Sequence, residues 1–352
     1  MLSLGTHYIA ENEYDDFVNC HPDENILLCV GFNSNKIDNQ PLIPQGHKFR
    51  SSRQATQLSF NVELSQLKKQ NTLELWTSPG NIKYGVEGNI RFSLMDDLLM
   101  GAVAVEINGE INQFINSIYK EIIDFLGNQK MPVLVRMWNY FPDINGAENN
   151  VERYQQFCSG RYQAFEQKTQ NFQSELPAAT AIGTKGDLLT IYFLAVNDSV
   201  HAIENQRQLS AFKYPKQYGN HSPSFARASL KQWNENSADL YISGTASIVG
   251  HESQHLADCH LQLQEIIRNI AALIDQEVLL AKGISKALIN SLQLNFVKVY
   301  LKEEKLLALA EQVINEETDW QGRVMFLKGS ICRQELLIEV EGIWHMDIGL
   351  NP

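Results

Sequence analysis

The sequence predicts an α+β fold made of two modules of the order β-α-β-α-β-β, fused in one chain behind a β-rich N-terminal part. Three observations predict it. Apolar residues recur with helical spacing in several stretches, short apolar runs lie between those stretches, and the same order of elements occurs twice, in residues 88–200 and 237–352. A chain of 352 residues, 44% of them hydrophobic, is long enough to bury a large core.

The first module, residues 88–200, begins with a strand-like stretch from Ile90 to Ile107 that carries a turn at Asp96-Asp97. The apolar residues from Ile111 to Leu126 then have the spacing of one helix face. Pro132–Phe141 is typical of a buried strand, with proline at its first position, where a missing N–H does least harm. The module ends with a predicted helix and two strands, at Val151–Phe165, Leu176–Gly183 and Asp187–Val196.

The second module, residues 237–352, repeats this order. A strand at Leu240–Val249 precedes a helix that Asp258 could cap and whose apolar positions run from Leu263 to Ile274. The elements predicted after it are a strand, a helix and two strands, at Asn295–Leu301, Glu303–Ile314, Arg323–Leu327 and Leu336–Trp344.

The rest of the chain does not follow the repeat. In residues 1–87, Ile26–Phe32, Leu58–Leu64 and Thr72–Thr77 are predicted as strands, with polar loops and no helix between them. Residues 201–236 are rich in Tyr, Pro, Gly, Asn and Ser. A connection of this length is more often functional than merely connecting, so we expect it to contribute to an active site.

Charge and motifs exclude several classes of protein. The 29 Lys and Arg against 41 Asp and Glu give a formal net charge of −12, which disfavours nucleic acid and anionic membranes as partners. The sequence contains no Gly-x-Gly-x-x-Gly motif after a strand, no Walker loop and no Gly-x-Ser-x-Gly elbow. Nucleotide binding and serine hydrolysis therefore lack support.

Cysteine use and the start of the chain predict a cytoplasmic protein. The five cysteines are scattered without a Cys-x-x-Cys pair, which fits a reducing compartment. Met1–Asp16 has neither the basic nor the apolar region of a signal peptide, and the longest apolar stretch, Leu98–Val105, is too short to span a bilayer.

One motif suggests a metal site. Residues His251 to His255 match the His-Glu-x-x-His signature of zinc proteases, with Glu252 as the base and His260 or Cys259 as a third ligand. That chemistry requires both histidines on one face of a helix, whereas this pentapeptide follows a strand ending at Gly250 and precedes the predicted cap Asp258. The motif is therefore predicted to lie in a loop, and a zinc hydrolase stays as an alternative.

Two further patterns point to a small acidic ligand. Six arginines stand among aromatic or small residues rather than in charge runs, which suggests guanidinium forks for carboxylates, although any single one could form a surface ion pair: Arg136, Arg153, Arg161, Arg227, Arg323 and Arg333. In the last strand, Glu339 and Glu341 share a face. This face could be solvated, or one of the two could be a general acid whose pKa is raised by burial.

Several segments, taken in order, resemble the chorismatases, enzymes that remove the enolpyruvyl group of chorismate. They are Arg136–Tyr140 with Asn145, Glu152–Arg161, Pro223–Ala228, Ser243–Gly250 and Cys332–Glu339, and they cover about residues 85–345. The resemblance implies RidA (YjgF)-like modules, small proteins that form trimers, fused here into a pseudo-oligomer whose site lies between the middle and C-terminal modules. In that family the Gly-His-Glu segment is no zinc site.

The resemblance also implies the reaction and its residues. Glu339 protonates the terminal methylene of the enolpyruvyl ether, Cys332 influences the ring product, and arginines bind the two carboxylates; the substrate-binding set is Arg153, Arg161, Arg227, Arg136, Tyr218, Thr245 and Ala246. No metal or other cofactor is implied, and the only partner is the small molecule chorismate. We expect a monomer or weak homo-oligomer.

Cys332 favours 3-hydroxybenzoate as the product beside pyruvate, alone or with 4-hydroxybenzoate. Ala246, in place of a glycine, leaves hydrolysis to a dihydroxycyclohexadiene carboxylate open. A RidA-like protein that binds small acids without converting them is the remaining alternative.

Overall fold

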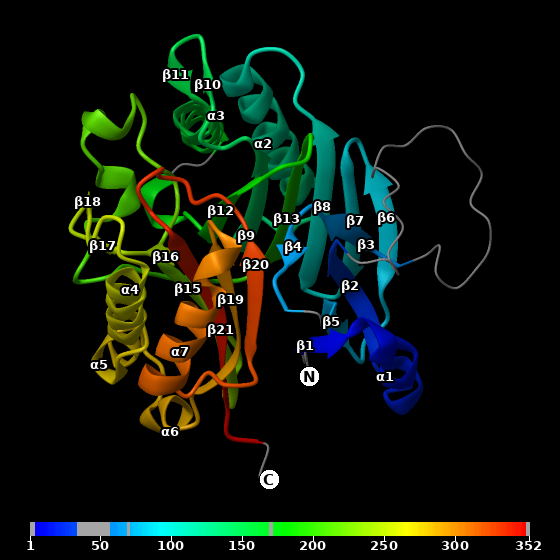
Figure 1. The fold of residues 1–352 in the computed structure, drawn as a ribbon. Helices are drawn as coiled ribbons and strands as arrows, with labels where there is room; N and C mark the ends of the chain where they lie inside the picture. The colour runs from blue at the N-terminus through cyan, green and yellow to red at the C-terminus, as the bar shows by residue number, and fades with distance from the viewer. Residues whose placement is uncertain (1–3, 34–56, 69–70, 169–171, 350–352) are drawn as a thin grey trace.

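The computed structural model describes residues 4–33, 57–68, 71–168 and 172–349. In these residues the chain forms three main β-sheets, with helices against the outer faces of the two larger ones (Figure 1). The α+β class predicted from the sequence is confirmed. No helix in the described part of the chain has the length and apolar character that crossing a membrane requires.

The middle sheet has six strands in the order β12-β9-β13-β8-β7-β6. Only β9 and β12 run parallel within it, and α2 and α3 pack on one of its faces through a shared apolar core. Its elements are β6 (Lys83–Glu87), β7 (Ile90–Met95), β8 (Leu98–Glu106), α2 (Ile111–Asn128), β9 (Val133–Pro142), α3 (Arg153–Lys168), β12 (Ala178–Thr184) and β13 (Leu188–Val196). A small hairpin, β10 (Ala147–Glu148) and β11 (Val151–Glu152), precedes α3.

The C-terminal sheet has seven strands in the order β14-β15-β16-β21-β19-β20-β4. Helices α4 and α7 pack against it, and the Asp258 carboxylate accepts a 3.0 Å hydrogen bond from the Leu261 amide, as expected of the cap of α4. The elements are β14 (His201–Ile203), β15 (Ala228–Asn234), β16 (Ser237–Ala246), β17 (Ile248–Val249), β18 (Glu252–Ser253), α4 (Cys259–Leu273), α5 (Gln276–Leu280), α6 (Lys286–Ile289), β19 (Gln293–Leu301), α7 (Leu307–Glu317), β20 (Val324–Lys328) and β21 (Ile338–Asp347).

The two larger sheets have the same topology. The order β12-β9-β13-β8-β7 of the middle sheet corresponds to β20-β19-β21-β16-β15 of the C-terminal sheet, and each contains one parallel pair, β9 with β12 and β19 with β20. The β-α-β-α-β-β order predicted for both modules is confirmed, with a further hairpin strand before each.

The N-terminal sheet repeats part of this arrangement. Its order is β1-β5-β2-β3, with β2 and β3 parallel, which matches β8-β13-β9-β12 of the middle sheet. Its strands are β1 (Gly5–Ala10), β2 (Asn25–Phe32), β3 (Ser59–Val62) and β5 (Thr72–Ser78), while β4 (Ser65–Gln66) joins the C-terminal sheet through β20. By this correspondence β5, β13 and β21 are equivalent strands of the three sheets.

One helix was missed in the sequence analysis, and one expectation about local structure is wrong. The N-terminal part contains a helix, α1 (Tyr14–Cys20), which the sequence analysis missed because it is short and only Tyr14 and Phe17 anchor it on the sheet; the polar stretch at 34–56 lies outside the described residues. The segment 201–236 is not only a loop, since it contains β14 and β15. The sequence of β15 did not indicate a buried strand because it contains Lys231, whose ammonium is nevertheless buried and bonded to Asp198.

The inner faces of the three sheets meet in one core. Residues of β2, β5, β9, β13, β19 and β21 all belong to the largest apolar cluster. Aromatic rings from different sheets pack together there: Trp76 meets Trp138 edge to face and stacks on Tyr241. The face of β21 that carries Glu339 and Glu341 looks into this junction, so both carboxyls are buried and the solvated interpretation of that face is wrong.

Candidate active site

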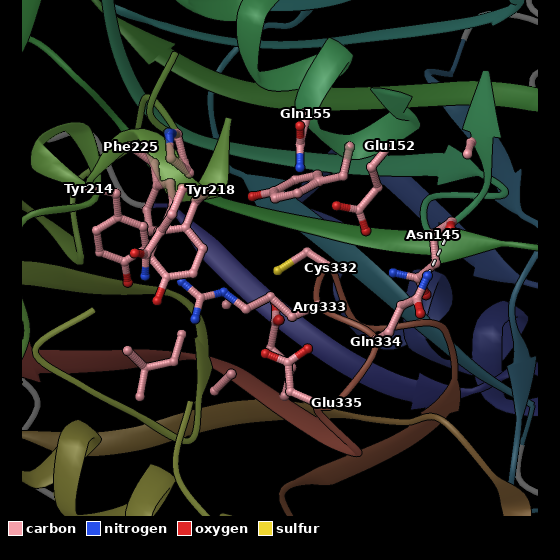
Figure 2. Close-up of a pocket in the computed structure, with 18 of the residues that line it drawn as sticks. Asn145, Glu152, Gln155, Tyr214, Tyr218, Phe225, Cys332, Arg333, Gln334 and Glu335 are labelled. Atoms are coloured by element: carbon pink, nitrogen blue, oxygen red, sulfur yellow. Dashed lines mark hydrogen bonds between the residues drawn. The ribbon is translucent and has the colours of Figure 1, made fainter. Parts of the chain in front are cut away.

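A cavity of about 430 Å³ opens between the middle and C-terminal modules (Figure 2). Five segments line the cavity: the β10–α3 region, the loop before β15, the end of β16, the loop at 332–335, and the start of strand β21 at Glu339. In Figure 2, Glu152 and Gln155 approach from one side, Tyr214 and Tyr218 from another, and Cys332 lies between them. The volume of this cavity is within the range usual for small-molecule sites.

Glu339 is the acid of this cavity. The β-ladder places it beside Ala246 of β16 and Tyr300 of β19, and the side chain is only 4% exposed. No hydrogen bond or ion pair to its carboxyl is found among the described residues. Burial, and after it the charge of Glu341, raise the pKa of Glu339 to about 8 against the opposing effect of Arg136. Glu339 therefore holds a proton near neutral pH.

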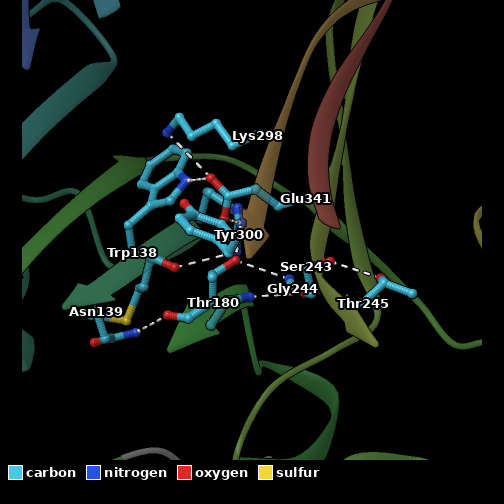
Figure 3. A network of polar contacts seen from close by, with 12 residues as sticks. Trp138, Asn139, Thr180, Ser243, Gly244, Thr245, Lys298, Tyr300 and Glu341 are labelled. Carbon is cyan, nitrogen blue, oxygen red and sulfur yellow. Dashed lines mark hydrogen bonds and ion pairs between the residues drawn. The ribbon is translucent and has the colours of Figure 1, made fainter. Parts of the chain in front are cut away.

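Glu341, two residues further along β21, is in the opposite state. Its carboxylate accepts hydrogen bonds from Arg136 (2.7 Å) and Trp138 (3.0 Å) and pairs with Lys298 at 3.2 Å (Figure 3). Burial alone would raise its pKa, but Lys298 and Arg136 together hold the pKa below the usual value. The two carboxyls on one strand face thus have different protonation states, a division typical of acid–base sites.

A smaller cavity of about 40 Å³ extends the site inward and shares Tyr154, Cys332 and Glu339 with the main one. Arg161 of α3 lines it and is 3% exposed. Its guanidinium lies 5.1 Å from the Tyr119 ring centroid, and its Nε has no hydrogen-bond partner among the described residues. The Ser224 hydroxyl, in the same lining, is likewise buried and without a partner there. Unpaired buried donors are costly, so an acceptor from a ligand would satisfy them.

Arg227 lines the main cavity and is also buried. Its Nη2 donates to the Leu209 carbonyl and the Tyr214 hydroxyl, both at 2.8 Å, whereas its Nε has no partner in the described part of the chain. The guanidinium is held between the rings of Tyr214 and Phe225. Arg161 and Arg227 therefore bring two donors with free capacity to the surroundings of Glu339.

The other two arginines of the expected binding set lie elsewhere. Arg153 donates to the Pro142 carbonyl at 3.2 Å and pairs with Glu148, and it lines a separate polar cavity of about 850 Å³. Arg136 is 1% exposed and is engaged by Glu341 and Thr180. The structure thus does not bring Arg153 or Arg136 to the walls of the main cavity.

Tyr218 and Ala246 line the cavity as expected, but Thr245 does not. The Tyr218 hydroxyl lies 3.1 Å from His251 Nδ1, and the Arg333 guanidinium stacks 4.1 Å from the Tyr218 ring centroid. Thr245, on the other face of β16, donates its hydroxyl proton to the Ser243 carbonyl.

Sequence reasoning did not assign Tyr214, Phe225, Arg333 or Gly244 to the site. Phe225, Arg333 and Gly244 stand within the segments that carry the family resemblance, which was the available signal; Tyr214 has no comparable signal.

Cys332 lies beside Glu339 and lines both cavities. Burial raises the pKa of its thiol well above the usual value, and the Glu339 carboxyl raises it further, although Arg333 lowers it. A thiol in this state stays protonated at neutral pH, so it is a small packing group rather than a nucleophile.

The His-Glu-x-x-His match does not form a metal site. It lies across the β17–β18 hairpin, as the loop prediction required, so its histidines share no helix face. His251 contacts Tyr218, whereas His255 lies 3.6 Å from Glu265 of α4. Among the described residues, no three His, Cys, Asp or Glu side chains are arranged to hold a metal ion.

A protonated carboxylic acid in a cavity between two modules, with two buried arginines in the linings whose Nε donors are unpaired among the described residues, defines an enzyme site for a small polyanionic molecule. Comparisons with known proteins agree. Residues 74–195 match a family model described as "Chorismatase FkbO/Hyg5-like, N-terminal". A 3-hydroxybenzoate synthase of Streptomyces hygroscopicus is 32% identical over 276 residues, which are 77% of this chain and 80% of that one.

A chorismatase of Streptomyces rapamycinicus is 30% identical over 286 residues, covering 80% of this chain and 85% of the relative. A chorismatase crystal structure superposes with a TM-score of 0.83 at 26% identity, over 97% of this chain and 98% of that chain. The chain belongs to the chorismatase family.

Proposed function

We propose that this protein cleaves the enolpyruvyl ether of chorismate to pyruvate and 3-hydroxybenzoate, alone or with 4-hydroxybenzoate. Membership of the chorismatase family supports it, as does a relative named 3-hydroxybenzoate synthase. The observation that carries the proposal is Glu339, a buried carboxyl with its pKa raised to about 8 inside the cavity that Arg227 also lines.

In the proposed reaction, Glu339 donates its proton to the terminal methylene carbon of the enol ether. The electron pair of the carbon–carbon double bond forms the new C–H bond, and the adjacent carbon becomes an oxocarbenium centre. The C4 hydroxyl oxygen then attacks C3 of the ring, the ether bond at C3 breaks, the side chain leaves as pyruvate, and the hydroxyl proton restores the acid. The resulting 3,4-epoxide opens at C4 and its C3 proton moves to the oxygen, which gives 3-hydroxybenzoate; opening at C3 gives 4-hydroxybenzoate. Chorismate is converted to pyruvate and hydroxybenzoate without net gain or loss of atoms, so the overall reaction needs no oxidant or reductant.

The substrate carries two carboxylates, and the structure offers two buried arginines with unpaired Nε donors, Arg161 and Arg227. We assign one carboxylate to each, because charge-assisted hydrogen bonds from guanidinium are the strongest neutral-pH contacts available to a carboxylate. Arg153, which the sequence placed in this role, is instead held by Pro142 and Glu148 in the other cavity, so we propose no substrate contact for it.

The product branch rests on Cys332 and Ala246, which both line the cavity that contains Glu339. A small uncharged thiol leaves the ring fragment without a group to activate water, which favours internal rearrangement over hydrolysis. Hydrolysis would instead consume one water and give a dihydroxycyclohexadiene carboxylate.

The test is incubation of the purified protein with chorismate, with pyruvate followed by a coupled lactate dehydrogenase assay and the ring product identified by chromatography. We expect one pyruvate for each hydroxybenzoate formed, with 3-hydroxybenzoate as the main ring product. Glu339→Gln should lower kcat/KM by about 10²–10⁴, the usual contribution of a general acid. Absence of pyruvate above the spontaneous rate contradicts the proposal, and tight binding without turnover would favour the non-catalytic alternative.

A further inference from the structure

Four charged side chains are buried where the three sheets meet, and we call them the central charge cluster: Glu74 of β5, Arg136 of β9, Lys298 of β19 and Glu341 of β21. The Lys298 ammonium is its hub. It lies 2.5 Å from Glu74 Oε2, 2.9 Å from the Tyr192 hydroxyl and 3.2 Å from Glu341 Oε1. These three acceptors come from β5, β13 and β21, the equivalent strands of the three sheets.

The central charge cluster is electrically balanced. Arg136 and Lys298 supply two positive charges, and Glu74 and Glu341 supply two negative ones. Although burial alone would lower it, Glu74 and Glu341 hold the pKa of Lys298 well above its usual value, so the ammonium stays charged. An ionised Glu339 would be a second anion on that face of β21 and a third beside the cluster, whose two cations are already paired with Glu74 and Glu341.

Glu341 pairs with Arg136, the cation of the cluster that could otherwise stabilise an ionised Glu339. Arg136 Nη2 donates to Glu341 Oε2 at 2.7 Å and to Thr180 Oγ1 at 2.5 Å, and its Nη1 donates to the Met137 carbonyl. The Thr180 oxygen also accepts the Gly244 amide at 2.9 Å, which ties Arg136 to the segment that packs on Glu339 (Figure 3).

We propose that Glu341 is a positioning residue that keeps the proton on Glu339, because it engages Arg136 and so leaves the acid without a counter-charge from the central charge cluster. The inference rests on the proposed function, in which Glu339 must be protonated to act. Glu341 touches neither cavity and acts through Arg136 and the charge balance alone.

The other titratable or charged groups around Glu339 come from five elements, and none of them pairs with its carboxyl among the described residues: Glu152 of β11, Tyr154, Cys158 and Arg161 of α3, Tyr214, Tyr218 and Arg227 of the loop before β15, Cys332, Arg333 and Glu335 of the loop before β21, and Tyr300 of β19.

Charge balance predicts shifts of opposite sign. In Glu341→Gln, Arg136 loses its carboxylate and the cluster has one excess positive charge, so ionisation of Glu339 should move down by at least about one pH unit. In Arg136→Met the cluster has one excess negative charge, so the ionisation of Glu339 should move to higher pH. The double variant Arg136→Met/Glu341→Gln is balanced again and should titrate close to wild type, as should Glu341→Asp, which keeps the charge.

The experiment measures Glu339 directly, by carboxyl ¹³C NMR of protein labelled at glutamate Cδ, with the resonance identified by its absence in Glu339→Gln. The pH profile of pyruvate release is recorded in parallel. We expect Glu341→Gln to lose about tenfold or more in rate at pH 8 and to recover on acidification, because acid restores the proton.

A merely structural role would lower the rate equally at every pH and leave the titration of Glu339 in place, which would overturn the proposal. Breaking a buried ion pair can prevent folding. If Glu341→Gln does not fold, the upward shift in Arg136→Met decides, and its absence also overturns the proposal. Because the NMR titration does not depend on turnover, a protein that fails to release pyruvate contradicts the proposed function without touching this inference.

Discussion

Gly244 of β16 gives the Glu339 carboxyl the space that a side chain would fill: a Cβ at Gly244 would lie 2.0 Å from Glu339 Oε1 and 3.1 Å from Thr180 Cγ2. The absence of a side chain here has no backbone reason, since this glycine does not have a positive φ. The position of the acid is therefore set by a residue on the neighbouring strand as much as by its own backbone.

Gly244→Ala should displace the Glu339 carboxyl and lower kcat about 10- to 100-fold, because a shift of about 1 Å at a reacting group commonly costs that much. Pyruvate release measures it. Gly127→Ala is the matched control, since nothing lies within 4 Å of its missing Cβ, and it should leave kcat unchanged. Equal activity of the two variants would mean that Glu339 does not need its observed position.

The raised pKa of Glu339 makes the stability of the fold depend on pH. The native carboxyl keeps its proton up to about pH 8, whereas the unfolded one loses it near 4.5. Its contribution to stability is therefore complete below about pH 4.5 and is lost as the pH rises to about 8, a change on the order of a few kcal/mol. Glu339→Gln, which cannot ionise, should gain stability relative to wild type between pH 5 and pH 8.5.

Urea unfolding of both proteins at the two pH values measures this. If the difference in the free energy of unfolding between wild type and Glu339→Gln is the same at both, Glu339 is not the group that titrates.

Arg161→Lys and Arg153→Lys test which of the two arginines of α3 binds a carboxylate of the substrate. Lysine keeps the charge but loses the guanidinium fork, so Arg161→Lys should raise KM for chorismate about 10- to 100-fold, the equivalent of one charge-assisted hydrogen bond. Arg153→Lys, which changes a residue in the other cavity, should stay within about threefold of wild type. Steady-state kinetics measure both KM values. A larger rise in KM for Arg153→Lys than for Arg161→Lys would move the carboxylate site to Arg153.

Cys332→Ala should keep pyruvate release within about tenfold of wild type, because a thiol that stays protonated is not the nucleophile. Its ring product should shift from 3-hydroxybenzoate towards the dihydroxycyclohexadiene carboxylate, since the smaller side chain admits water beside the ring. Chromatography of the product measures the shift. Cys20→Ala, at an exposed cysteine, is the control and should leave the product unchanged. Loss of pyruvate release in Cys332→Ala would show that the thiol takes part in the cleavage itself.

The regular elements of the two larger modules could be predicted because their pattern is local. The helical spacing from Ile111 to Leu126 and the apolar run in Asp187–Val196 each reflect burial on a sheet that the element itself helps to form. Helix α1 and strand β15 could not be predicted in this way, since their anchors are few or, for Lys231, depend on an ion pair with Asp198 elsewhere in the chain.

The candidate site was predictable only in part. Alternation in the last strand placed Glu339 and Glu341 on one face, but their different protonation states are decided by Arg136, 205 residues away from Glu341 in the chain, and by Lys298 on another strand. Likewise, Arg153 and Arg161 stand on the same helix, and nothing in their sequence surroundings indicates that only Arg161 turns towards Glu339.

The contact between Lys298 and Glu74 extends the argument to the N-terminal sheet, which contributes no wall to the cavity. Glu74 supplies one of the four charges whose sum governs the acid, so the docking of β5 belongs to the electrostatics of the reaction as well as to the packing of the core. A shortened chain that begins at the middle module would keep every cavity-lining residue and still change the acidity of Glu339.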